Sequence, residues 1–331
     1  MLRAMRSRTG RAPAEERTRC RAGRAPTEER TRCRKSGKAE METLESLKRR
    51  VERTRDLQSV VKSMKALAAV KIRHFEQTAD SVGTYRQAVE LGLQVAFAGR
   101  FWRPDRTEAR ESRQAFAIVI GSDQGLCGQF NDQITAAARE QLKQPAGDLI
   151  AVGHQVADRL SLAGLRVAER LAVPHSSGAI ARTVGTLLVR ADRWRRDARA
   201  ERILLLHNQR RGGASSEPQA VQLWPLDLDW LREVAERPWE SRSLPTYRIP
   251  GAQLQAALIR QHLFVILFRG LAESMAAEQA SRLAAMQTAE RDIADRLEAL
   301  SKRHQQQRQR AITDELLDIT SGRRALQRRP R

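Results

Sequence analysis

Two long stretches of the chain repeat apolar side chains at helical spacing. Residues 41–103 contain no proline, and apolar or neutral side chains recur there at steps of three and four: Leu44, Leu47, Val51, Thr54, Leu57, Val61, Met64 and Ala68. This spacing predicts a helix with one stripe that packs on a partner helix, as in a coiled coil. The small residues of Ala66–Val70 would let that partner approach closely.

The second stretch runs from Gly251 to Gly322, with no proline and with Gly270 as its one internal glycine. At about 1.5 Å per residue, an unbroken helix of this length would reach roughly 105 Å, which is wider than an ordinary domain core. Pro250 and Gly251 predict its start, and Gly322 predicts its stop. One stripe is expected to pack on the first helix in the antiparallel sense: Leu283, Met286, Ile293, Leu297 and Leu300.

Between these stretches, residues 112–248 alternate short apolar runs with amphipathic segments. Strands are predicted at Ala115–Ile120, Asp148–Gly153 and Arg202–His207, with an edge strand at Ala220–Leu226. Helices are predicted among them, for example at Asp132–Leu142 and Ala179–Ala191. This alternation indicates a mostly parallel sheet covered by helices, a Rossmann-like α/β domain. Residues 209–220 are predicted to form a turn-rich loop, and residues 227–250 irregular chain.

The net charge of +21 predicts an acidic partner, which could be nucleic acid, an anionic membrane surface or an acidic protein. Residues 1–40 hold 13 Lys and Arg against 5 Glu, so the rest of the chain is basic as well. No run approaches the roughly 18 uncharged apolar residues of a membrane-spanning helix. The longest apolar cluster, Leu263–Phe268, is far shorter, and no membrane span is expected.

A polar unit of 13 residues occurs twice near the N-terminus, at Gly10–Ala22 and at Gly23–Lys35. The unit offers nothing with which to bury a core, so residues 1–40 are expected to be a disordered basic extension. The alternative is that translation begins at Met41, where a helix start follows. The acidic residues of the repeats argue against a transit peptide.

The segment Phe116–Asp132, FAIVIGSDQGLCGQFND, has the form of a nucleotide-binding loop. A phosphate loop needs a Lys and then a hydroxyl after its last glycine, but Gln129 and an aromatic residue follow Gly128. A dinucleotide fingerprint needs G-x-G-x-x-G, whereas these glycines are spaced four and then three residues apart. A structural turn between strand and helix is therefore favoured, with Ser122 or Asp123 as a cap.

No catalytic or metal-binding pattern is evident elsewhere. The six His lack ligand spacing, and His154 is interpreted as a surface or turn residue rather than a base. The three Cys form no framework, and Cys127 is expected to be a small buried side chain. No cofactor and no metal are expected.

Four segments, in chain order, resemble signatures of the γ subunit of F-type ATP synthases. Ser122–Asn131 is similar to the motif S-D-[basic]-G-L-C-G-x-x-N, and Val61–Arg73 is similar to the N-terminal helix signature. Glu278–Met286 and Arg308–Gly322 resemble two C-terminal signatures, so the resemblance covers residues 41–326. Gln124 departs from the usual basic residue, and the third signature lacks the T-D-N that usually follows it. The first helix looks most like the γ subunits of the alternate, or N-type, ATPases, which are proposed to pump sodium.

The resemblance implies a rotating shaft rather than an enzyme. The shaft helices, residues 41–103 and 251–322, would stand inside the head of α and β subunits (α3β3), with the ε subunit and the ring of c subunits as further partners. The α/β domain, residues 112–248, would sit on that ring, whose rotation couples ion flow to ATP synthesis or hydrolysis. The chain would be non-catalytic by itself and peripheral at the cytoplasmic face of a bacterial plasma membrane. It would touch the membrane only through the complex, and the coupling ion, proton or sodium, is chosen in the ring.

The resemblance also implies roles for single residues. Met64 aligns with a methionine near the lever segment of β, and Arg308, Gln309 and Thr313 align with polar contacts to its catch loop. The alternative for these four is an ordinary core or solvated side chain. A structural role is implied for the other motif residues: Ser122, Asp123, Gly125, Leu126, Cys127, Gly128, Asn131, Glu278 and Gln279. The basic tail, residues 323–331, is expected to fray past an apolar collar or to meet acidic residues.

Two other classes of function remain as alternatives. A basic coiled-coil protein could bind nucleic acid or act as a scaffold. Nucleic-acid binding predicts aromatic residues interleaved with basic ones, and aromatic residues are 4% of the chain. A dinucleotide-dependent enzyme is disfavoured by the glycine spacing.

Overall fold

The computed structural model describes residues 43–98, 115–142, 146–197, 200–212, 215–239, 242–243 and 245–327. The predictions for residues 1–40 and for residues 328–331 of the basic tail lie outside this part of the chain, and so do the predicted ends of the first shaft helix, residues 41–42 and 99–103, and the start of the α/β domain, residues 112–114.

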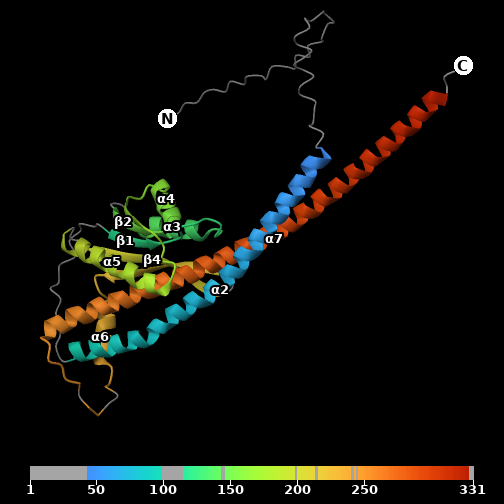
Figure 1. Cartoon of the computed structure of the whole chain (residues 1–331). Helices are drawn as coiled ribbons and strands as arrows, with labels where there is room; N and C mark the ends of the chain where they lie inside the picture. Colours follow the sequence, from blue (N-terminus) through green and yellow to red (C-terminus); the bar gives the residue numbers. More distant parts are fainter. Residues whose placement is uncertain are drawn as a thin grey trace, which may run out of the picture.

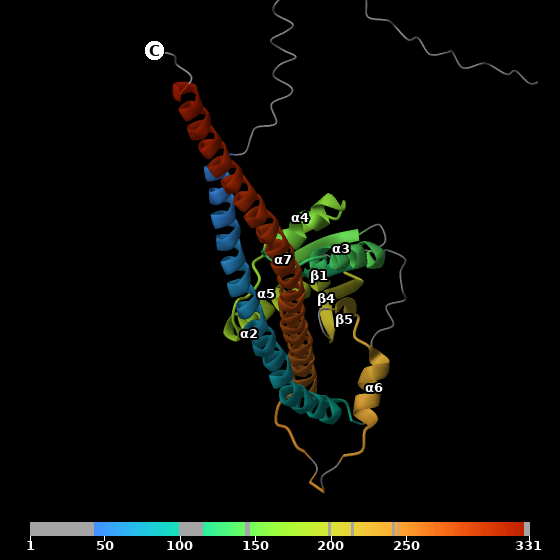
Figure 2. The same cartoon turned by 90° about the vertical axis from the view of Figure 1, so that its right-hand side faces the viewer.

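Two long helices form an antiparallel pair, here called the shaft (Figures 1 and 2). α2 spans Leu44–Phe97, 54 residues, and α7 spans Gly251–Gln327, 77 residues. The start of α2 lies beside the far part of α7, where Leu47 contacts Leu300. The other end of α2 lies beside the start of α7, because the Gln255 side chain donates to the carbonyl oxygen of Ala96 at 2.9 Å. The predicted antiparallel pair of terminal helices is confirmed.

α7 does not stop at Gly322, where the sequence predicted its end, but continues to Gln327. A glycine inside a helix costs only about 1 kcal/mol relative to alanine. A helix stop needs a left-handed residue with a capping contact. Gly322 has neither a positive φ nor a neighbour within 4 Å of an added Cβ, so nothing there turns the chain.

The contact stripe of α2 differs from the predicted one at its first residue, Leu44, which is 38% exposed, and at two further positions. Leu57 and Met64 are exposed, by 59% and 37%, whereas Gln58 and Lys65 are half-buried. A stripe that faces one partner advances by three and four residues in alternation, and the predicted stripe took two steps of three in succession. The observed stripe consists of Leu47, Val51, Thr54, Gln58, Val61, Lys65 and Ala68. The predicted α7 stripe is buried or half-buried throughout: Leu283, Met286, Ile293, Leu297 and Leu300.

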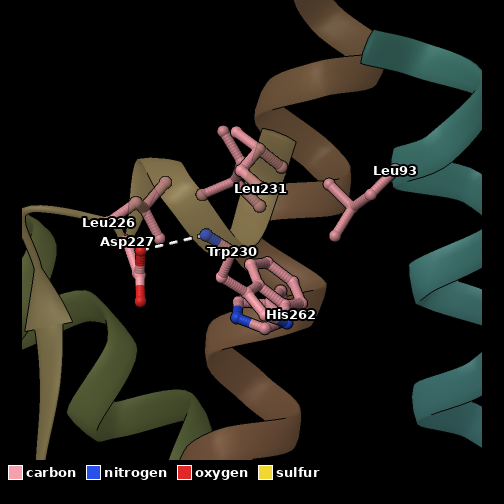
Figure 3. Close-up of a pocket in the computed structure, with 7 residues that line it drawn as sticks. Leu93, Leu226, Asp227, Trp230, Leu231 and His262 are labelled. Carbon is pink, nitrogen blue, oxygen red and sulfur yellow. Dashed lines mark hydrogen bonds between the residues drawn. The ribbon is translucent and has the colours of Figure 1, made fainter. Parts of the chain in front are cut away.

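Residues 227–250, predicted to be irregular, contain the helix α6, Leu228–Glu236. The Asp227 side chain caps it by accepting hydrogen bonds from the backbone N–H groups of Asp229 and Trp230, both at 3.0 Å (Figure 3). Leu231 and Val234 are buried against α2. The helix has only nine residues, lies between prolines and buries only these two side chains. Its apolar periodicity is therefore too short to predict a helix from the sequence. α6, the end of α2 and the start of α7 are here called the foot (Figure 1).

The sheet holds five strands in the order β3-β2-β1-β4-β5. β1–β4 run parallel and β5 runs antiparallel to β4, so the predicted mostly parallel sheet is confirmed. The strands are β1 Ala115–Ile120, β2 Ala146–Val152, β3 Val167–Leu171, β4 Arg202–Gly212 and β5 Ser215–Trp224. The helices between them are α3 Phe130–Gln141, α4 His154–Leu162 and α5 Ser177–Arg196.

Two parts of the sheet were not predicted. β3 is an edge strand with alternate exposed residues, among them Ala168 and Arg170, so it lacks a continuous apolar run. The predicted loop at residues 209–220 is instead the polar hairpin of β4 and β5, in which Gln209 pairs with Glu217. Backbone hydrogen bonds rather than apolar burial stabilise this hairpin, so the pattern of hydrophobic residues does not predict it.

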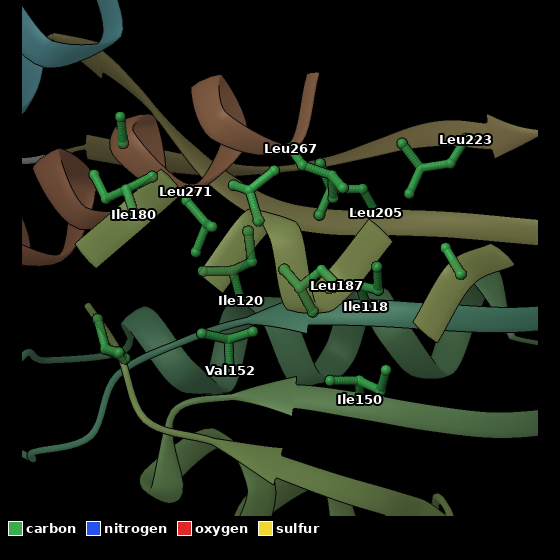
Figure 4. Close-up of a cluster of buried hydrophobic side chains, with 14 of the residues drawn as sticks. Ile118, Ile120, Ile150, Val152, Ile180, Leu187, Leu205, Leu223, Leu267 and Leu271 are labelled. Atoms are coloured by element: carbon green, nitrogen blue, oxygen red, sulfur yellow. The ribbon is translucent and has the colours of Figure 1, made fainter. Parts of the chain in front are cut away.

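Each face of the sheet is covered by helices, and α7 is one of them. Alternate residues of β1 point to opposite faces. Ile118 and Ile120 pack with α5 and with Leu267 and Leu271 of α7 (Figure 4), whereas Val119 packs with α3 and α4 on the other face. α7 approaches β4 tightly at Gly270, where an added Cβ would lie 2.8 Å from Leu205 Cδ2. The shaft is therefore built into the domain rather than joined by a linker.

One window of α7 is long and apolar enough to cross a membrane by length and composition, with a mean hydropathy of 1.2. The sequence had predicted no such segment. Of this window, 22% is buried in the fold. Within this stretch Leu267 is buried in the sheet core, and four residues pack against that core, so the fold itself uses the apolar side chains: Leu263, Phe264, Ile266 and Phe268.

Candidate functional site

The glycine loop, Ser122–Asn131, is held together by its own polar side chains. The Asn131 amide donates to Ser122 Oγ at 2.7 Å, and its oxygen accepts from the Ser122 backbone N–H at 3.0 Å. Asn131 Nδ2 also lies 3.6 Å from Cys127 Sγ. Cys127 is buried, as expected. The spacing of the motif therefore lets Asn131, at the end of the loop, bind Ser122 at its beginning.

Asp123 ties three loops together rather than capping α3. Its Oδ1 accepts from the backbone N–H of His154 at 3.0 Å and lies 2.8 Å from His154 Nδ1, and its Oδ2 accepts from the Val173 N–H at 2.8 Å. Burial raises the pKa of Asp123, but these hydrogen bonds outweigh burial and leave the pKa below its usual value. Its contribution to stability is therefore present above about pH 3.9 and is lost as the pH falls through the lowered folded-state pKa.

The loop packs directly on α7. Cys127 and Phe130 form a buried cluster with Ala277. The Arg282 guanidinium reaches the carbonyl oxygen of Gly125 at 3.5 Å and pairs with Glu278 at 2.6 Å. Glu278 and its neighbour Gln279 are both buried. These contacts, here called the anchor, join the end of β1 to the middle of the shaft.

Glu278 is the most deeply buried carboxylate of the anchor. Burial raises its pKa, although the nearby Arg282 opposes this shift. Ionised Glu278 is therefore less favourable in the fold than in water. Its burial therefore lowers the free energy of unfolding, and this loss appears as the pH rises from about 4.3 towards the raised folded-state pKa.

The glycine at the end of β1, Gly121, serves close packing. An added Cβ on Gly121 would lie 2.3 Å from Val156 Cβ, so only glycine lets α4 approach. In open α/β sheets, ligands bind beyond the strand ends where the strand order reverses, here between β1 and β4. That position is filled by Phe130, which is fully buried and whose carbonyl oxygen accepts from the Asn208 side chain at 3.0 Å. Within the described residues, no group of three or more His, Cys, Asp or Glu could hold a metal ion.

The predicted partner-contact residues lie on the exposed shaft, but not together. Lys65 beside Met64 pairs with Glu290, and Arg308 lies 18 residues further along α7, roughly 27 Å away. Arg308, Gln309 and Thr313 are exposed, and the Thr313 hydroxyl donates to the carbonyl oxygen of Gln309 at 2.9 Å. In the part of the chain that the structure describes, no contact assigns these side chains a partner subunit, so their roles stay predictions.

The last turns of α7 run beyond the start of α2 as a single helix (Figure 1). This tip, residues 308–324, is exposed at every position, and it includes the apolar side chains Ile312, Leu316, Leu317 and Ile319. α2 shows a second exposed apolar set on the shaft: Leu57, Val60, Met64, Leu67 and Val70. Apolar side chains gathered in this way mark surfaces that contact other proteins.

Two residues that contact the glycine loop were not singled out from the sequence. Arg282 stands four residues after Glu278, which is the spacing of a helical ion pair, so a search for such pairs would have found it. Asn208 lies in β4, just past the predicted strand Arg202–His207, and carries no sequence signal of its contact with Phe130.

The chain matches known proteins over most of its length. The family model described as "ATP synthase" matches residues 43–326. The chain is 28% identical over 302 residues to the ATP synthase gamma chain of Rhizobium rhizogenes, covering 86% of this chain and all of that protein. It is 26% identical over 295 residues to the gamma chain of Pelotomaculum thermopropionicum, covering 87% of this chain and all of that protein.

Solved structures show the same fold. One is a chain of the Euglena gracilis mitochondrial ATP synthase in a structure of OSCP, F1 and c-ring, with a TM-score of 0.62 and 17% identity. That match covers 86% of this chain and 94% of the other. A chain from the rotor of the same enzyme has a TM-score of 0.57 and 15% identity, covering 81% and 98%. Because the family model spans most of the chain and its relatives are gamma chains, the chain belongs to the family of ATP synthase gamma chains.

Proposed function

We propose that this chain is the central-stalk rotor subunit of an F-type ATP synthase and transmits torque between an ion-driven ring and a catalytic head. The observation that carries this proposal is α7, a single helix that is a layer of the α/β domain at one end and an exposed tip at the other. A helix of this kind moves as one body with the domain on which it is packed. Its gamma-chain relatives support the same role.

The partners follow from this role. The α and β subunits surround the shaft, and the ε subunit and the c-ring meet the α/β domain and the foot. Structures with the same fold were solved in assemblies that contain F1 and a c-ring, which supports this assignment. The chain is non-catalytic by itself, and it lies at the cytoplasmic face of a bacterial plasma membrane through its complex. The finer likeness to N-type γ subunits, and with it sodium transport, stays a prediction.

A rotation assay tests the proposal. Leu162, at the end of α4, is 88% exposed and offers a labelling position on the domain. We would change Leu162→Cys, replace Cys20 and Cys33 by Ser, and leave the buried Cys127. The chain is assembled with its own α and β subunits, β is fixed to a surface, and a filament is attached at residue 162. ATP is expected to drive rotation in one direction.

The control is the same complex with Leu162→Ser, to which no filament attaches. ATP hydrolysis without any rotation of the labelled domain would contradict the proposal. Hydrolysis of ATP by the purified chain alone would contradict the non-catalytic role.

A further inference from the structure

α6 lies apart from the sheet and packs on the foot of the shaft. Its buried residues, Leu231 and Val234, join a small cluster with Val89 and Leu93 of α2, and Ile259 of α7 packs against that cluster. Such a small contact makes α6 an element that can open locally without unfolding of the sheet.

Polar contacts fix α6 to α2. Arg237, the residue after α6, pairs with Glu90 at 3.1 Å, and its carbonyl oxygen accepts from the Gln94 side chain. Glu90 also lies 3.5 Å from Arg86. The charge of Glu90 is therefore already shared between two guanidinium groups.

On the side of α7, α6 is held by an aromatic contact. Trp230 stacks on His262 with ring centroids 4.3 Å apart and an angle of 24° between the rings (Figure 3). Nδ1 of His262 is buried and has no hydrogen-bond partner. His262 lies between a small apolar cavity, shown in Figure 3, and a groove of about 270 Å³ formed by α2, β4, β5, α6 and α7.

The charged and titratable groups around His262 do not offer it a free acceptor. From α2 these are Arg86 and Glu90, and from β4 the groove receives His207. α7 itself contributes Arg269 and Glu273, which pair with each other at 2.7 Å, while Glu273 also lies 3.2 Å from His207. From α6, Asp227 lines the apolar cavity and is used as the helix cap.

We propose that the contact between Trp230 and His262 is an acid-sensitive latch, which releases α6 from the shaft when the imidazole takes up a proton. An imidazolium carries two N–H donors, and Nδ1 here would be a buried donor without an acceptor. Its charge would also lie beside Arg86, while the attraction of Glu90 is already shared. When α6 leaves, water solvates both donors, so protonation favours the open state.

The sign of the pH dependence follows from burial. Burial lowers the pKa of His262, while Glu90 raises it and Arg86 lowers it by smaller amounts. The closed state therefore binds its proton less readily than the open state, whose imidazole has a pKa of about 6.5. Docking of α6 is complete above about pH 6.5 and weakens as the pH falls from there towards the lowered pKa of the closed state. Acid would thus loosen the foot while leaving the anchor and the tip in place.

Hydrogen exchange of the full-length chain tests this inference. Amide protection of residues 228–236 is measured from pH 7.5 to pH 5.5 and corrected for the intrinsic exchange rate. Opening is expected to increase up to about tenfold over this range. His262→Phe keeps an aromatic ring on Trp230 but cannot take up a proton, so protection should become independent of pH. The control His175→Gln changes an exposed histidine far from the foot and should leave the pH dependence intact.

His207→Gln removes the neighbouring imidazole and should also leave the dependence intact. Pronounced pH dependence that persists in His262→Phe, or its absence in the unchanged chain, would overturn the proposal. If His262→Phe does not fold, His262→Gln provides the same test, because its amide is uncharged throughout this pH range. These outcomes do not depend on rotation, so failure here leaves the proposed function untouched.

Discussion

Arg282 is the residue on which the anchor depends most at the scale of single side chains. Its guanidinium neutralises the buried Glu278 and also reaches the backbone of the glycine loop at Gly125. The two side chains are only 14% and 7% exposed. A pair this deeply buried adds little net stability, but removal of one partner leaves an uncompensated charge.

Arg282→Ala is expected to lower the free energy of unfolding by about 3 kcal/mol at neutral pH, because it strands the Glu278 carboxylate in the interior. The loss should shrink as the pH falls, since burial raises the pKa of Glu278 and a protonated carboxyl needs no counter-charge. Urea unfolding at pH 7 and pH 5 measures both effects.

The control for this change is Arg296→Ala, which removes an exposed arginine from the same helix. Its effect should stay within about 0.5 kcal/mol. A loss for Arg282→Ala no larger than that of the control would show that the anchor does not depend on the pair.

At the scale of elements, the register of the shaft is set by alternating steps of three and four along α2. This alternation puts polar Gln58 and Lys65 against α7 and turns apolar Leu57 and Met64 outwards. Lys65 is accommodated because Glu290 of α7 lies opposite at 2.6 Å. The outward apolar residues are then available to a partner rather than to the shaft itself.

Leu47 and Leu57 provide a matched test of this register. Leu47 is 1% exposed, whereas Leu57 is 59% exposed on the same helix. Leu47→Ala is expected to destabilise the shaft by about 2 kcal/mol through loss of buried methyl groups beside Leu300. Leu57→Ala should change stability by less than about 0.5 kcal/mol. Hydrogen exchange of the first turns of α2 measures both, and equal losses would refute the register.

At the scale of the whole molecule, one helix serves two surfaces that lie far apart. Its N-terminal part, residues 263–276, forms part of the sheet core, and its C-terminal end is the exposed tip. A load applied at the tip therefore reaches the domain through an unbroken helix, with α2 as a brace along most of the way (Figure 2). Under this interpretation, the acidic partner predicted from the basic charge of the chain does not have to be a nucleic acid.

The double change Arg308→Ala with Gln309→Ala tests the tip in the assembled complex. If both side chains contact the head, loss of two hydrogen bonds at about 1 kcal/mol each should slow coupled ATP hydrolysis by up to about thirtyfold. Assembly should remain intact, because both residues are exposed and away from the contact with α2. Turnover of the purified complex is measured beside Arg303→Ala, an exposed change on the same helix. Unchanged turnover would count against the predicted contact.

The helical and strand elements with a strong apolar period were predictable from the sequence, and those without one were not. β1 has the predicted bounds, Ala115–Ile120, because all of its residues from Phe116 onwards are buried. β3 was missed, and so was the end of the β4–β5 hairpin that lies between the predicted strands Arg202–His207 and Ala220–Leu226, because the pairing there comes from the backbone rather than from apolar burial. α6 was missed because its small apolar face acquires meaning only beside α2.

The site divides in the same way. The sequence alone predicted that the glycine loop forms a turn between a strand and a helix and that Cys127 is buried, because both follow from residue types and spacing along the chain. Only the tertiary structure decided that Asp123 ties three loops together, that Arg282 meets the loop, and that Leu57 and Met64 face outwards. The physical reason is that the spacing of residues along the chain determines the local backbone conformation. Contacts between residues far apart in sequence, and the side of a helix that faces its partner, depend instead on which surfaces pack together.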